Sequence, residues 1–527
     1  MKNLNIEQIR QKLEQRIQND KFLSLKDLPG PDTFKDIKKA TSRIISAINN
    51  KETITIVGDY DADGVASTAI MLEFFSIALG VKINHIIPNR FKDGYGVSTS
   101  IVDKINSGII ITVDNGISAI EAANICKQKS IDLIITDHHI VGEILPNAYA
   151  IVNPKQNDCN FPFKDICGAQ VAWYLCASIK KELNLSYNLI QLFDFLTIAI
   201  VADVMPMVSL NKTLVKKGLN SILNSKRPAF IAIRNRFALN NNLSEDDIGF
   251  KIAPLINCAG RMDDANLALD FLLSFDEYEA NEHLDNLLEL NDKRKQEQLD
   301  MFEDAKSKVN IKDNVIIVSS DKWNEGILGI VASKLCDKYK KPSFVFKKKD
   351  NLFKASARSV GNINLYDLLS EVKDLTLGYG GHKGAAGVLV ENTNMDEFKK
   401  QINHNIIDLP KEDRVLIQNI FCIINLDLIN NELYNLINLY RPFGLDNLMP
   451  NFAFIDLNII NITKIGKSKQ YQKIVVSNGN VNVDLLVFID IDDFKIGETI
   501  SFVACISKNE FRGDITYNLL FKELYIL

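Results

Sequence analysis

Between residues 50 and 205, short apolar runs alternate with segments in which apolar side chains recur at helical spacing. The helix-like segments are residues 65–79, 118–129 and 169–181. Strands that alternate with helices form βαβ units, whose strands run parallel within one sheet. The chain is therefore predicted to have an α/β fold whose first domain is a parallel sheet covered by helices. The predicted strands are Ile54–Val57, Ile83–Ile87, Ile109–Val113, Leu133–Thr136 and Ala150–Val152.

Acidic residues follow the apolar runs, where strands are expected to end. Because the carboxyl ends of parallel strands meet at one edge of a sheet, these side chains are expected to converge. The first group, at residues 59–63, could instead be only a turn and a helix cap, since Asp and Gly are common in both. Acidic residues recur after four apolar runs, and we interpret the end of each run as a strand end. This recurrence favours a shared site. The groups are Asp59, Asp61 and Asp63, then Asp114, then Asp137, His138 and His139, and finally Asp203 after an apolar run ending at Ala202.

Converging carboxylates repel one another unless they hold protons or bind a cation. Carboxylates combined with an imidazole suit Mn²⁺ or Mg²⁺ better than zinc. Two such ions, about 3.5–4 Å apart and bridged by one carboxylate, would lower the pKa of a bound water and clamp a phosphate during hydrolysis. The pattern therefore predicts a two-metal centre with Mn²⁺ or Mg²⁺.

The rest of the chain changes character three times. Residues 211–311 lack strand alternation and are predicted to be a helical connector with one long helix near 276–308. Residues 312–408 combine strand-like runs with one helical run and a glycine-rich segment, which indicates a second, smaller α/β domain. Residues 409–527 carry five β-rich runs, with Asn478-Gly479 as a hairpin turn, and fit an OB-type barrel. A fragment of a β-sandwich is the alternative.

The formal charge of −5 argues against a chain coated with basic groups, but the charge is unevenly spread. Residues 306–358 hold thirteen basic and five acidic residues, so a basic wall that tracks a nucleic-acid backbone is one interpretation and a solvated lysine-rich face is the other. The eight cysteines form no C-x-x-C pair, which favours reduced thiols in a cytoplasmic protein. We expect no secretory leader and no membrane span, because the apolar runs are short.

In order and spacing, the motifs DYDAD, VDNG, TDHH and ADVMP resemble those of the DHH phosphoesterase family. GYGGHKGAAG at residues 378–387 resembles the signature of the DHH-associated domain. NRFKDGYG, INCAGRMDDA, SARS and the OB-like end are similar to the single-strand-specific exonucleases within that family, and the resemblance covers nearly the whole chain. It implies a Mn²⁺- or Mg²⁺-dependent nuclease that digests single-stranded DNA from the 5′ end, in DNA repair and recombination.

The resemblance also assigns roles to residues at the acidic centre. Asp114 is expected to bridge two ions, and His139 to contact phosphate or support a ligand. Many relatives have His where this chain has Val57, so one ion is expected to lack a ligand unless Asp59 or water supplies it. The expected metal ligands are Asp59, Asp61, Asp63, Asp114, His138 and Asp203, and the expected catalytic groups are Asp114, His138, His139 and Arg261.

Substrate contacts are expected outside the acidic centre. Glycine-rich segments let backbone N–H groups approach a phosphate, although a plain flexible turn is equally common for such a cluster. Guanidinium groups suit phosphate oxygens, and Arg261 is a candidate for the scissile phosphate. The resemblance gives Arg90, Ser356, Arg358, Gly380, Gly381 and His382 as substrate-binding residues. Basic groups beside aromatic residues suit single-strand binding, so Lys383, Lys467, Tyr471 and Arg512 are weaker candidates for nucleic-acid contact.

The sequence thus predicts five segments: an N-terminal helical part (1–48), the DHH catalytic domain (49–210), the connector (211–311), the DHH-associated domain (312–408) and the barrel (409–527). The partners implied by the resemblance are single-stranded DNA, a single-strand binding protein and a helicase, and a monomer is expected. Two other functions stay open at this point. One is a phosphodiesterase for short oligonucleotides or cyclic dinucleotides, and the other is a non-catalytic replication scaffold.

Overall fold

The computed structural model describes residues 3–239, 242–410, 413, 418–466, 469–489, 491, 493–511 and 513–525. The chain divides into two compact units. The larger unit comprises Pro29–Asp203 and Lys217–Ile417, and the smaller comprises Met1–Leu28, Val204–Lys216 and Gln418–Leu527.

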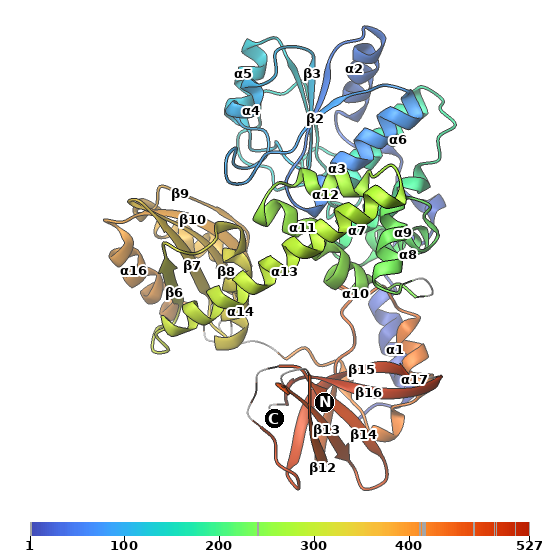
Figure 1. Ribbon diagram of the computed structural model, residues 1–527, viewed down its shortest axis with the longest axis vertical. Coiled ribbons are helices and arrows are strands. Elements are labelled where there is room, and N and C mark those ends of the chain that lie inside the picture. The colour runs from blue at the N-terminus through green and yellow to red at the C-terminus, as the bar shows by residue number, and fades with distance from the viewer. Residues whose placement is uncertain are drawn as a thin grey trace. The chain divides into compact units, whose positions relative to one another are not determined.

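The predicted parallel sheet is confirmed in the larger unit, in the order β2-β1-β3-β4-β5 (Figure 1). Strands β1 and β3 are buried along their whole length, as expected for a sheet covered on both faces. All five carboxyl ends therefore lie at one edge. The strands are β1 (Ile54–Val57), β2 (Asn84–Ile86), β3 (Ile109–Val113), β4 (Asp132–Thr136) and β5 (Ala150–Val152).

Helices cover both faces of this sheet (Figure 1). Helices α4 and α5 share one apolar cluster with the strands, and α2, α3 and α6 pack on the other side. Helix α3 continues into a π-helical turn at Phe74–Ala78. These helices are α2 (Ile37–Asn49), α3 (Ala62–Glu73), α4 (Thr99–Asp103), α5 (Ile120–Gln128) and α6 (Gly168–Glu182).

The apolar run before Asp203 is helix α7 (Phe193–Ala202), so the expectation of a fourth strand end there was wrong. A continuous apolar run fits a buried helix as well as a buried strand, since neither shows amphipathic spacing. Here the run packs against α3 and α6, and Asp203 is the C-cap of the helix. Asp203 thus comes to the sheet edge from a helix end.

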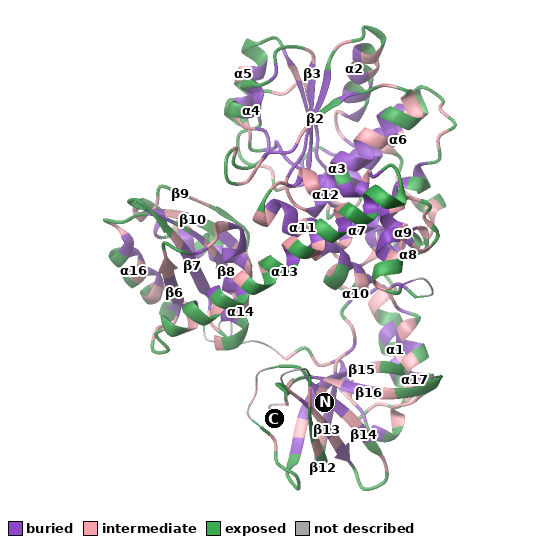
Figure 2. Cartoon of the chain, in the orientation of Figure 1, coloured by how far each residue is buried: buried purple, intermediate pink, exposed green. Residues whose placement is uncertain are grey.

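The connector is helical, as predicted, and α13 runs from Glu277 to Ser307. The Asp276 side chain caps α13 by accepting a hydrogen bond from the Glu279 N–H at 2.9 Å. One face of α13 is buried against α9, α11 and α12, and the other is exposed (Figure 2). Among the described residues, no helix is long and apolar enough to cross a membrane. The connector helices are α8 (Ser209–Asn224), α9 (Pro228–Arg236), α10 (Glu245–Asp247), α11 (Ala253–Met262), α12 (Asn266–Leu272) and α13.

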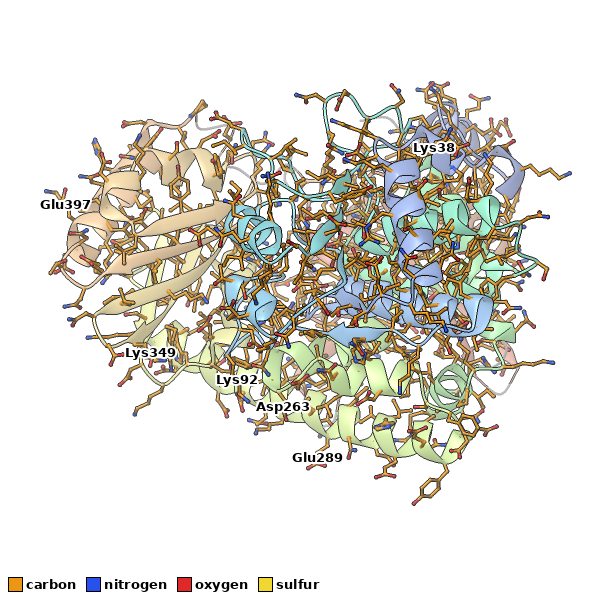
Figure 3. The ribbon with its side chains drawn as sticks, turned by 90° about the horizontal axis from the view of Figure 1, so that it is seen from above. Lys38, Lys92, Asp263, Glu289, Lys349 and Glu397 are labelled. Carbon is orange, nitrogen blue, oxygen red and sulfur yellow. The ribbon has the colours of Figure 1, made fainter. Side chains whose placement is uncertain are left out.

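The second α/β domain is built on a mixed sheet in the order β6-β7-β8-β10-β9. The glycine-rich segment is not a loop, because it forms β9, a short turn and β10, with the His382 N–H donating to the Ala385 carbonyl at 2.8 Å. Figure 3 shows Lys349 and Glu397 at the outer side of this domain. Its elements are β6 (Ile316–Ser320), α14 (Leu328–Tyr339), β7 (Ser343–Lys349), β8 (Leu352–Arg358), α15 (Leu365–Ser370), β9 (Gly378–Gly381), β10 (Ala385–Glu391) and α16 (Met395–Asp408).

The smaller unit contains the predicted barrel, which is closed because β12 pairs with both β13 and β15. The Asn478-Gly479 pair lies in the turn between β13 and β14, and Gly479 has the positive φ of 92° that favours glycine. Helix α1 (Ile6–Ile17) packs its Ile9 and Leu13 into the same apolar core. The other elements are β11 (Cys422–Ile423), α17 (Asn431–Asn438), β12 (Phe452–Ile465), β13 (Tyr471–Ser477), β14 (Asn482–Val487), β15 (Thr499–Phe511) and β16 (Asp514–Leu524).

Candidate active site

The turn from β1 into α3 brings three carboxylates into one buried space. Asp61 is the N-cap of α3, and its Oδ1 accepts hydrogen bonds from the N–H groups of Asp63 and Gly64, each at 3.1 Å. A side chain at Gly64 would lie 2.5 Å from the Asp59 carbonyl oxygen, so the turn is too tight for any other residue. Capping of the helix therefore fixes the direction of the carboxylates.

The N-terminus of α6 closes the other side of this space. The N–H groups of Gly168 and Ala169 donate to the two carboxylate oxygens of Asp63 at 2.6 and 2.8 Å. A Cβ atom at Gly168 would lie 2.4 Å from Oδ1 of Asp114. Two carboxylates from different segments thus pack directly against this helix end, where the helix dipole stabilises negative charge.

Asp114 follows β3 in the left-handed conformation, with φ of 65°. The next residue, Asn115, holds this turn: its Nδ2 donates to the carbonyls of Val57 at 3.0 Å and Val113 at 2.9 Å. The Asn115 side chain thereby joins the ends of β1 and β3, and the two neighbouring acidic turns keep a fixed spacing.

Asp137 organises the two histidines that follow β4. Its Oδ1 accepts hydrogen bonds from the N–H groups of His138 and His139 and lies 2.7 Å from Nδ1 of His139. Its Oδ2 accepts from the Ile117 N–H at 2.8 Å. Both carboxylate oxygens of Asp137 are therefore occupied by hydrogen bonds, and these contacts orient the two histidines.

The predicted ligand set converges around His138. Its Nε2 lies 3.2 Å from Oδ1 of Asp114, 3.6 Å from Oδ2 of Asp203 and 3.7 Å from Oδ2 of Asp63. Within the described residues, three groups place their ligand atoms within 4.8 Å of one another: Asp114, His138 and His139; Asp63, His138 and Asp203; Asp59, Asp61 and Asp114. The structure therefore brings together all six residues expected to bind metal.

Burial and mutual repulsion hold protons on this centre. Burial, followed by the charge of Asp61, raises the pKa of Asp63 to about 6. Burial, with the charges of Asp63 and Asp61, raises the pKa of Asp203 to about 8. The pKa of Asp59 and of Asp114 is raised well above the ordinary range for the same reasons. A divalent cation would relieve this repulsion.

The histidines are shifted in opposite directions. Burial and the neighbouring His139 lower the pKa of His138 to about 3, so its imidazole is neutral, the form that binds metals. Burial lowers the pKa of His139, but the hydrogen bond and charge of Asp137 outweigh it and raise that pKa to about 9. His139 is therefore positively charged near neutral pH.

Several buried polar atoms at this centre have no hydrogen-bond partner among the described residues: Oδ1 of Asp114, Nδ1 of His138 and Oδ2 of Asp203. Buried polar atoms are normally paired, so unpaired ones gathered at one place point to a missing ligand. Carboxylate oxygens with one neutral imidazole fit Mn²⁺ or Mg²⁺.

Val57 does not belong to this centre. Its side chain is fully buried in the apolar cluster that includes Val97, Ile101 and Ile110. Asp59, one of the two expected replacements for a ligand at this position, lies in a ligand group with Asp61 and Asp114.

Three arginines form a second, oppositely charged cluster beside the acidic centre. Arg261, on α11, is acted on electrostatically by Arg90, Arg358 and Asp61. Burial, together with the charge of Arg90, lowers the pKa of Arg261 to about 10. The Arg90 guanidinium stacks on the Tyr60 ring at 4.0 Å, and its buried Nε has no partner among the described residues. We call Arg90, Arg261 and Arg358 the arginine cluster.

The first turn of α14 packs against this cluster. A Cβ atom at Gly329 would lie 2.8 Å from Nη2 of Arg358 and 2.9 Å from Oγ of Ser356. Nη1 of Arg358 donates to Oγ of Ser356 at 3.2 Å and to the Ala357 carbonyl at 2.9 Å. Half-buried guanidinium groups with few carboxylate partners suit an anion such as a phosphate.

A cavity of about 1640 Å³ extends from the acidic centre across the second domain. One wall contains Tyr60, Tyr95 and His139, and the opposite wall contains the β9–β10 hairpin. Tyr366 and Tyr379 form an aromatic pair there, with ring centroids 5.5 Å apart. The predicted residues in the lining are Gly380, Gly381, His382 and Lys383.

Most of the basic residues in 306–358 do not line this cavity, which favours the alternative interpretation of a solvated lysine-rich face. Among the described residues that line the cavity, Lys354 is the only one of the thirteen. Lys308, Lys322 and Lys348 line a separate hollow that also contains acidic residues. Figure 3 shows Lys349 at the outer side of the domain.

The barrel residues are less completely placed. Tyr471 packs edge to face with Phe488 at 5.3 Å. The Lys473 ammonium pairs with Asp484 at 2.7 Å. The other two predicted contacts, Lys467 and Arg512, lie outside the described residues.

Sequence reasoning missed three supports of the site. Asp137 was seen only as part of the Asp-His-His triplet, while Gly168 and Asn115 were not singled out. A glycine that opens a predicted helix, as in Cys167-Gly168-Ala169, could have identified the α6 contact, because glycine permits close approach of a helix end.

Three family models match the chain: the N-terminal domain of the DHH family at residues 53–200, the DHHA1 domain at 312–408 and the RecJ OB domain at 422–523. The single-stranded-DNA-specific exonuclease RecJ of Haemophilus influenzae is 30% identical over 546 residues, with 96% of this chain and 93% of the relative covered. The chain belongs to the RecJ family.

The RecJ protein of Bacillus subtilis is 33% identical over 521 residues, and this chain spans 65% of its length. A solved exonuclease RecJ bound to manganese is 29% identical, with a TM-score of 0.63 over 73% of this chain and 97% of that one. The structure of RecJ from Thermus thermophilus in complex with Mn²⁺ has a TM-score of 0.84 to this chain at 23% identity. The match covers 100% of this chain and 79% of that one, and it supports the fold.

Proposed function

We propose that this chain is a metal-dependent exonuclease that digests single-stranded DNA from the 5′ end. The observation that carries the proposal is the position of the half-buried arginine cluster beside the buried acidic centre: the Arg90 guanidinium stacks at 4.0 Å on the ring of Tyr60, which lies between Asp59 and Asp61 in the chain. A phosphodiester strand with a terminal phosphate is a ligand that could satisfy both. The RecJ relatives are described as specific for single-stranded DNA.

The acidic centre would hold two Mn²⁺ or Mg²⁺ ions through Asp59, Asp61, Asp63, Asp114, His138 and Asp203. Bound ions supply a Lewis acid and a water of lowered pKa. Asp114 is shared between two of the three ligand groups, which supports its role as the bridge. The N-terminus of α6 keeps Asp63 aligned and ionised when the centre is loaded.

His139 and Arg261 would neutralise charge on the scissile phosphate. His139 is cationic near neutral pH and its Nδ1 is fixed by Asp137. Arg261 is half-buried, and its lowered pKa of about 10 still leaves it positively charged near neutral pH. Preorganised positive groups at a phosphoryl centre stabilise the transition state more than the ground state.

Arg90, Ser356 and Arg358 would bind the terminal 5′ phosphate. A phosphate ends the strand, so a site for it next to the acidic centre sets the cut close to the end and explains exonuclease rather than endonuclease action. Guanidinium forks bind phosphate oxygens in pairs, which favours a phosphorylated end over a hydroxyl.

The cavity would hold the following nucleotides. Gly380 has open space where a Cβ would lie, and Gly381 has φ of 139° and would collide with Ala385 if substituted. The side-chain-free hairpin lets a strand approach the backbone, with His382 and Lys383 nearby, and the Tyr366–Tyr379 pair offers stacking for bases. Unpaired bases can stack in this way, which favours a single strand over a duplex.

The barrel would bind the strand further along, with Tyr471 as a stacking residue and Lys467 and Arg512 as proposed contacts. We further propose a monomer that acts in the cytoplasm in DNA repair and recombination, on strands delivered by a single-strand binding protein and a helicase. The segment boundaries 1–48, 49–210, 211–311, 312–408 and 409–527 are proposed as its functional parts.

One assay tests the proposal directly. Purified protein with Mn²⁺ is incubated with a strand labelled at its 5′ end, the matching duplex, a dinucleotide and a cyclic dinucleotide. Release of labelled mononucleotide from the single strand, abolished by a chelator, is the expected result. Cleavage of the dinucleotides alone, internal cuts in the strand, or no release with any substrate would overturn it.

A further inference from the structure

Helices α3 and α7 carry metal-centre residues at one end of each. Asp61 and Asp63 lie at the start of α3, and Asp203 lies at the end of α7. Both Asp63 and Asp203 lie within 3.7 Å of Nε2 of His138, so these two helix ends meet at the centre. The helices pack against each other and run in opposite directions.

A half-buried arginine joins the other two ends. Nε of Arg227 donates to Oδ2 of Asp194 at 2.8 Å, in the first turn of α7. Its Nη2 donates to Oε1 of Glu73, the last residue of α3, at 2.7 Å, and Nη1 pairs with the other oxygen of Glu73. The guanidinium also stacks on Phe195 at 4.4 Å. One side chain thus bridges the two helices at the ends opposite the acidic centre.

Between these ends, close packing of side chains is what holds the two helices together. Residues 62–71 of α3 and 193–200 of α7 are buried, and most are small or apolar. Between the described residues of α3 and α7, no hydrogen bond joins the helices directly, and Oγ1 of Thr68 and of Thr197 each bond within their own helix. Apolar packing is non-directional, so it resists sliding of one helix along the other less than hydrogen bonds do.

We propose that Arg227 is a positioning residue for the metal centre: it fixes α3 against α7 and so sets the distance between Asp63 and Asp203. This inference rests on the metal site proposed above. Residues that orient metal ligands from a distance commonly alter affinity when they are changed. Arg227 acts through the two helices and touches no ligand.

The chain contains a matched arginine whose loss should not have this effect. Arg43 also bridges two carboxylates, donating to Oδ2 of Asp132 and Oε2 of Glu52, each at 2.6 Å. Its partners lie at the start of β4 and just before β1, strands whose register is fixed by backbone hydrogen bonds through β3. Loss of Arg43 should therefore lower stability without moving the ligands.

The test measures Mn²⁺ affinity by titration calorimetry and the Mn²⁺ paramagnetic resonance spectrum of the full chain. Arg227→Gln is compared with the parent and with Arg43→Gln, and thermal unfolding gives the stability of each. Because Arg227→Gln leaves the carboxylates of Glu73 and Asp194 without a cationic partner, a second variant replaces Arg227→Met, Glu73→Gln and Asp194→Asn together, which removes the bridge and the charges.

We expect both Arg227 variants to bind at least one ion about tenfold more weakly, with an altered spectrum, and Arg43→Gln to bind like the parent. Unchanged affinity and spectrum in the triple variant would overturn the inference, and so would an equal loss in Arg43→Gln. A parent that binds no Mn²⁺ would instead contradict the proposed metal site, so the two failures are distinguishable.

Discussion

The acidic centre gathers negatively charged groups and the half-buried arginine cluster gathers positively charged ones, and the two are held in different ways. The carboxylates of Asp61 and Asp63 are fixed by backbone N–H groups, such as those of Gly168 and Ala169 on Asp63. The guanidinium groups are held by an aromatic face and carbonyls, as Arg90 is by Tyr60 and Arg261 by the Gly326 carbonyl at 3.3 Å. Hydrogen bonds thus hold these carboxylates in place, whereas the arginine cluster keeps an N–H donor, Nε of Arg90, without a partner among the described residues.

This difference indicates two kinds of ligand. Metal coordination requires oxygen atoms at set distances, which helix ends and tight turns provide. A phosphate requires donors that can turn toward it, which stacked guanidinium groups provide. Four substitutions or conditions, from the largest expected effect to the smallest, test whether the two clusters have these separate roles.

Asp114→Asn should produce the largest loss. Asn tolerates the positive φ at this position, so the turn is kept while the proposed bridging charge is removed. We expect nuclease activity to fall on the order of 10³-fold or more. The metal-free protein should become more stable, because burial and repulsion oppose the charge of Asp114. A rate within tenfold of the parent would remove Asp114 from the chemistry.

Arg358→Gln should have a smaller and more selective effect. Its guanidinium is proposed to bind the terminal phosphate, so the apparent KM for a 5′-phosphorylated strand should rise by about 10- to 100-fold, as for loss of a charge-assisted pair. A strand with a 5′ hydroxyl should be affected less, and Mn²⁺ affinity should not change. Equal losses on both strands would place Arg358 outside the phosphate site.

The pH dependence of stability should distinguish the acidic centre without any substitution. The pKa values of Asp63 and Asp203 are raised to about 6 and about 8 in the folded chain, from a reference of 3.8. A raised pKa favours the protonated folded state, so this stabilisation is complete below about pH 4 and is lost as the pH rises through 6 and 8.

The Tm of the metal-free protein should therefore fall by a few degrees between pH 5.5 and 8.5, and added Mn²⁺ should restore it at the higher pH. Asp203→Asn serves as the control, since it should flatten the profile. A Tm that rises over this range in the parent relative to Asp203→Asn would contradict the assigned direction.

Val57→His should have the smallest effect on metal use. The position faces apolar side chains, so a buried imidazole should cost about 1–3 kcal/mol of stability without reaching the ions. Activity titrations with Mg²⁺ and with Mn²⁺ should then match those of the parent. A shift of the Mg²⁺ curve to lower concentration would show that histidine here does supply a ligand.

The sequence predicted the parts of the site that depend on strand ends. Asp59, Asp61, Asp114 and His138 follow apolar runs whose buried strands could be located directly, and parallel topology required them to converge. Asp203 was assigned to the right site for a partly wrong reason, because its apolar run is helix α7. Apolar periodicity cannot separate a buried helix from a buried strand.

The basic segment and the glycine-rich motif show what sequence cannot resolve. Charge counts along the chain do not say which face a lysine occupies, and only Lys354 among the described lysines of 306–358 lines the cavity. Glycines suggested a loop, although Gly380 and Gly381 lie in β9, whose pairing with β10 depends on distant residues. Supports such as Asn115 could not be found, since their role depends on contacts across the sheet.

Helix α1 belongs to the same compact unit as the barrel, and Ile9 and Leu13 lie in its core. About 400 residues separate α1 from the first barrel segment at Gln418. At ordinary rates of synthesis, the ribosome takes about 20 to 80 seconds to make that stretch. Ile9 and Leu13 can therefore join this core only after the barrel strands have been made, so the packing of α1 is a late step relative to its own synthesis.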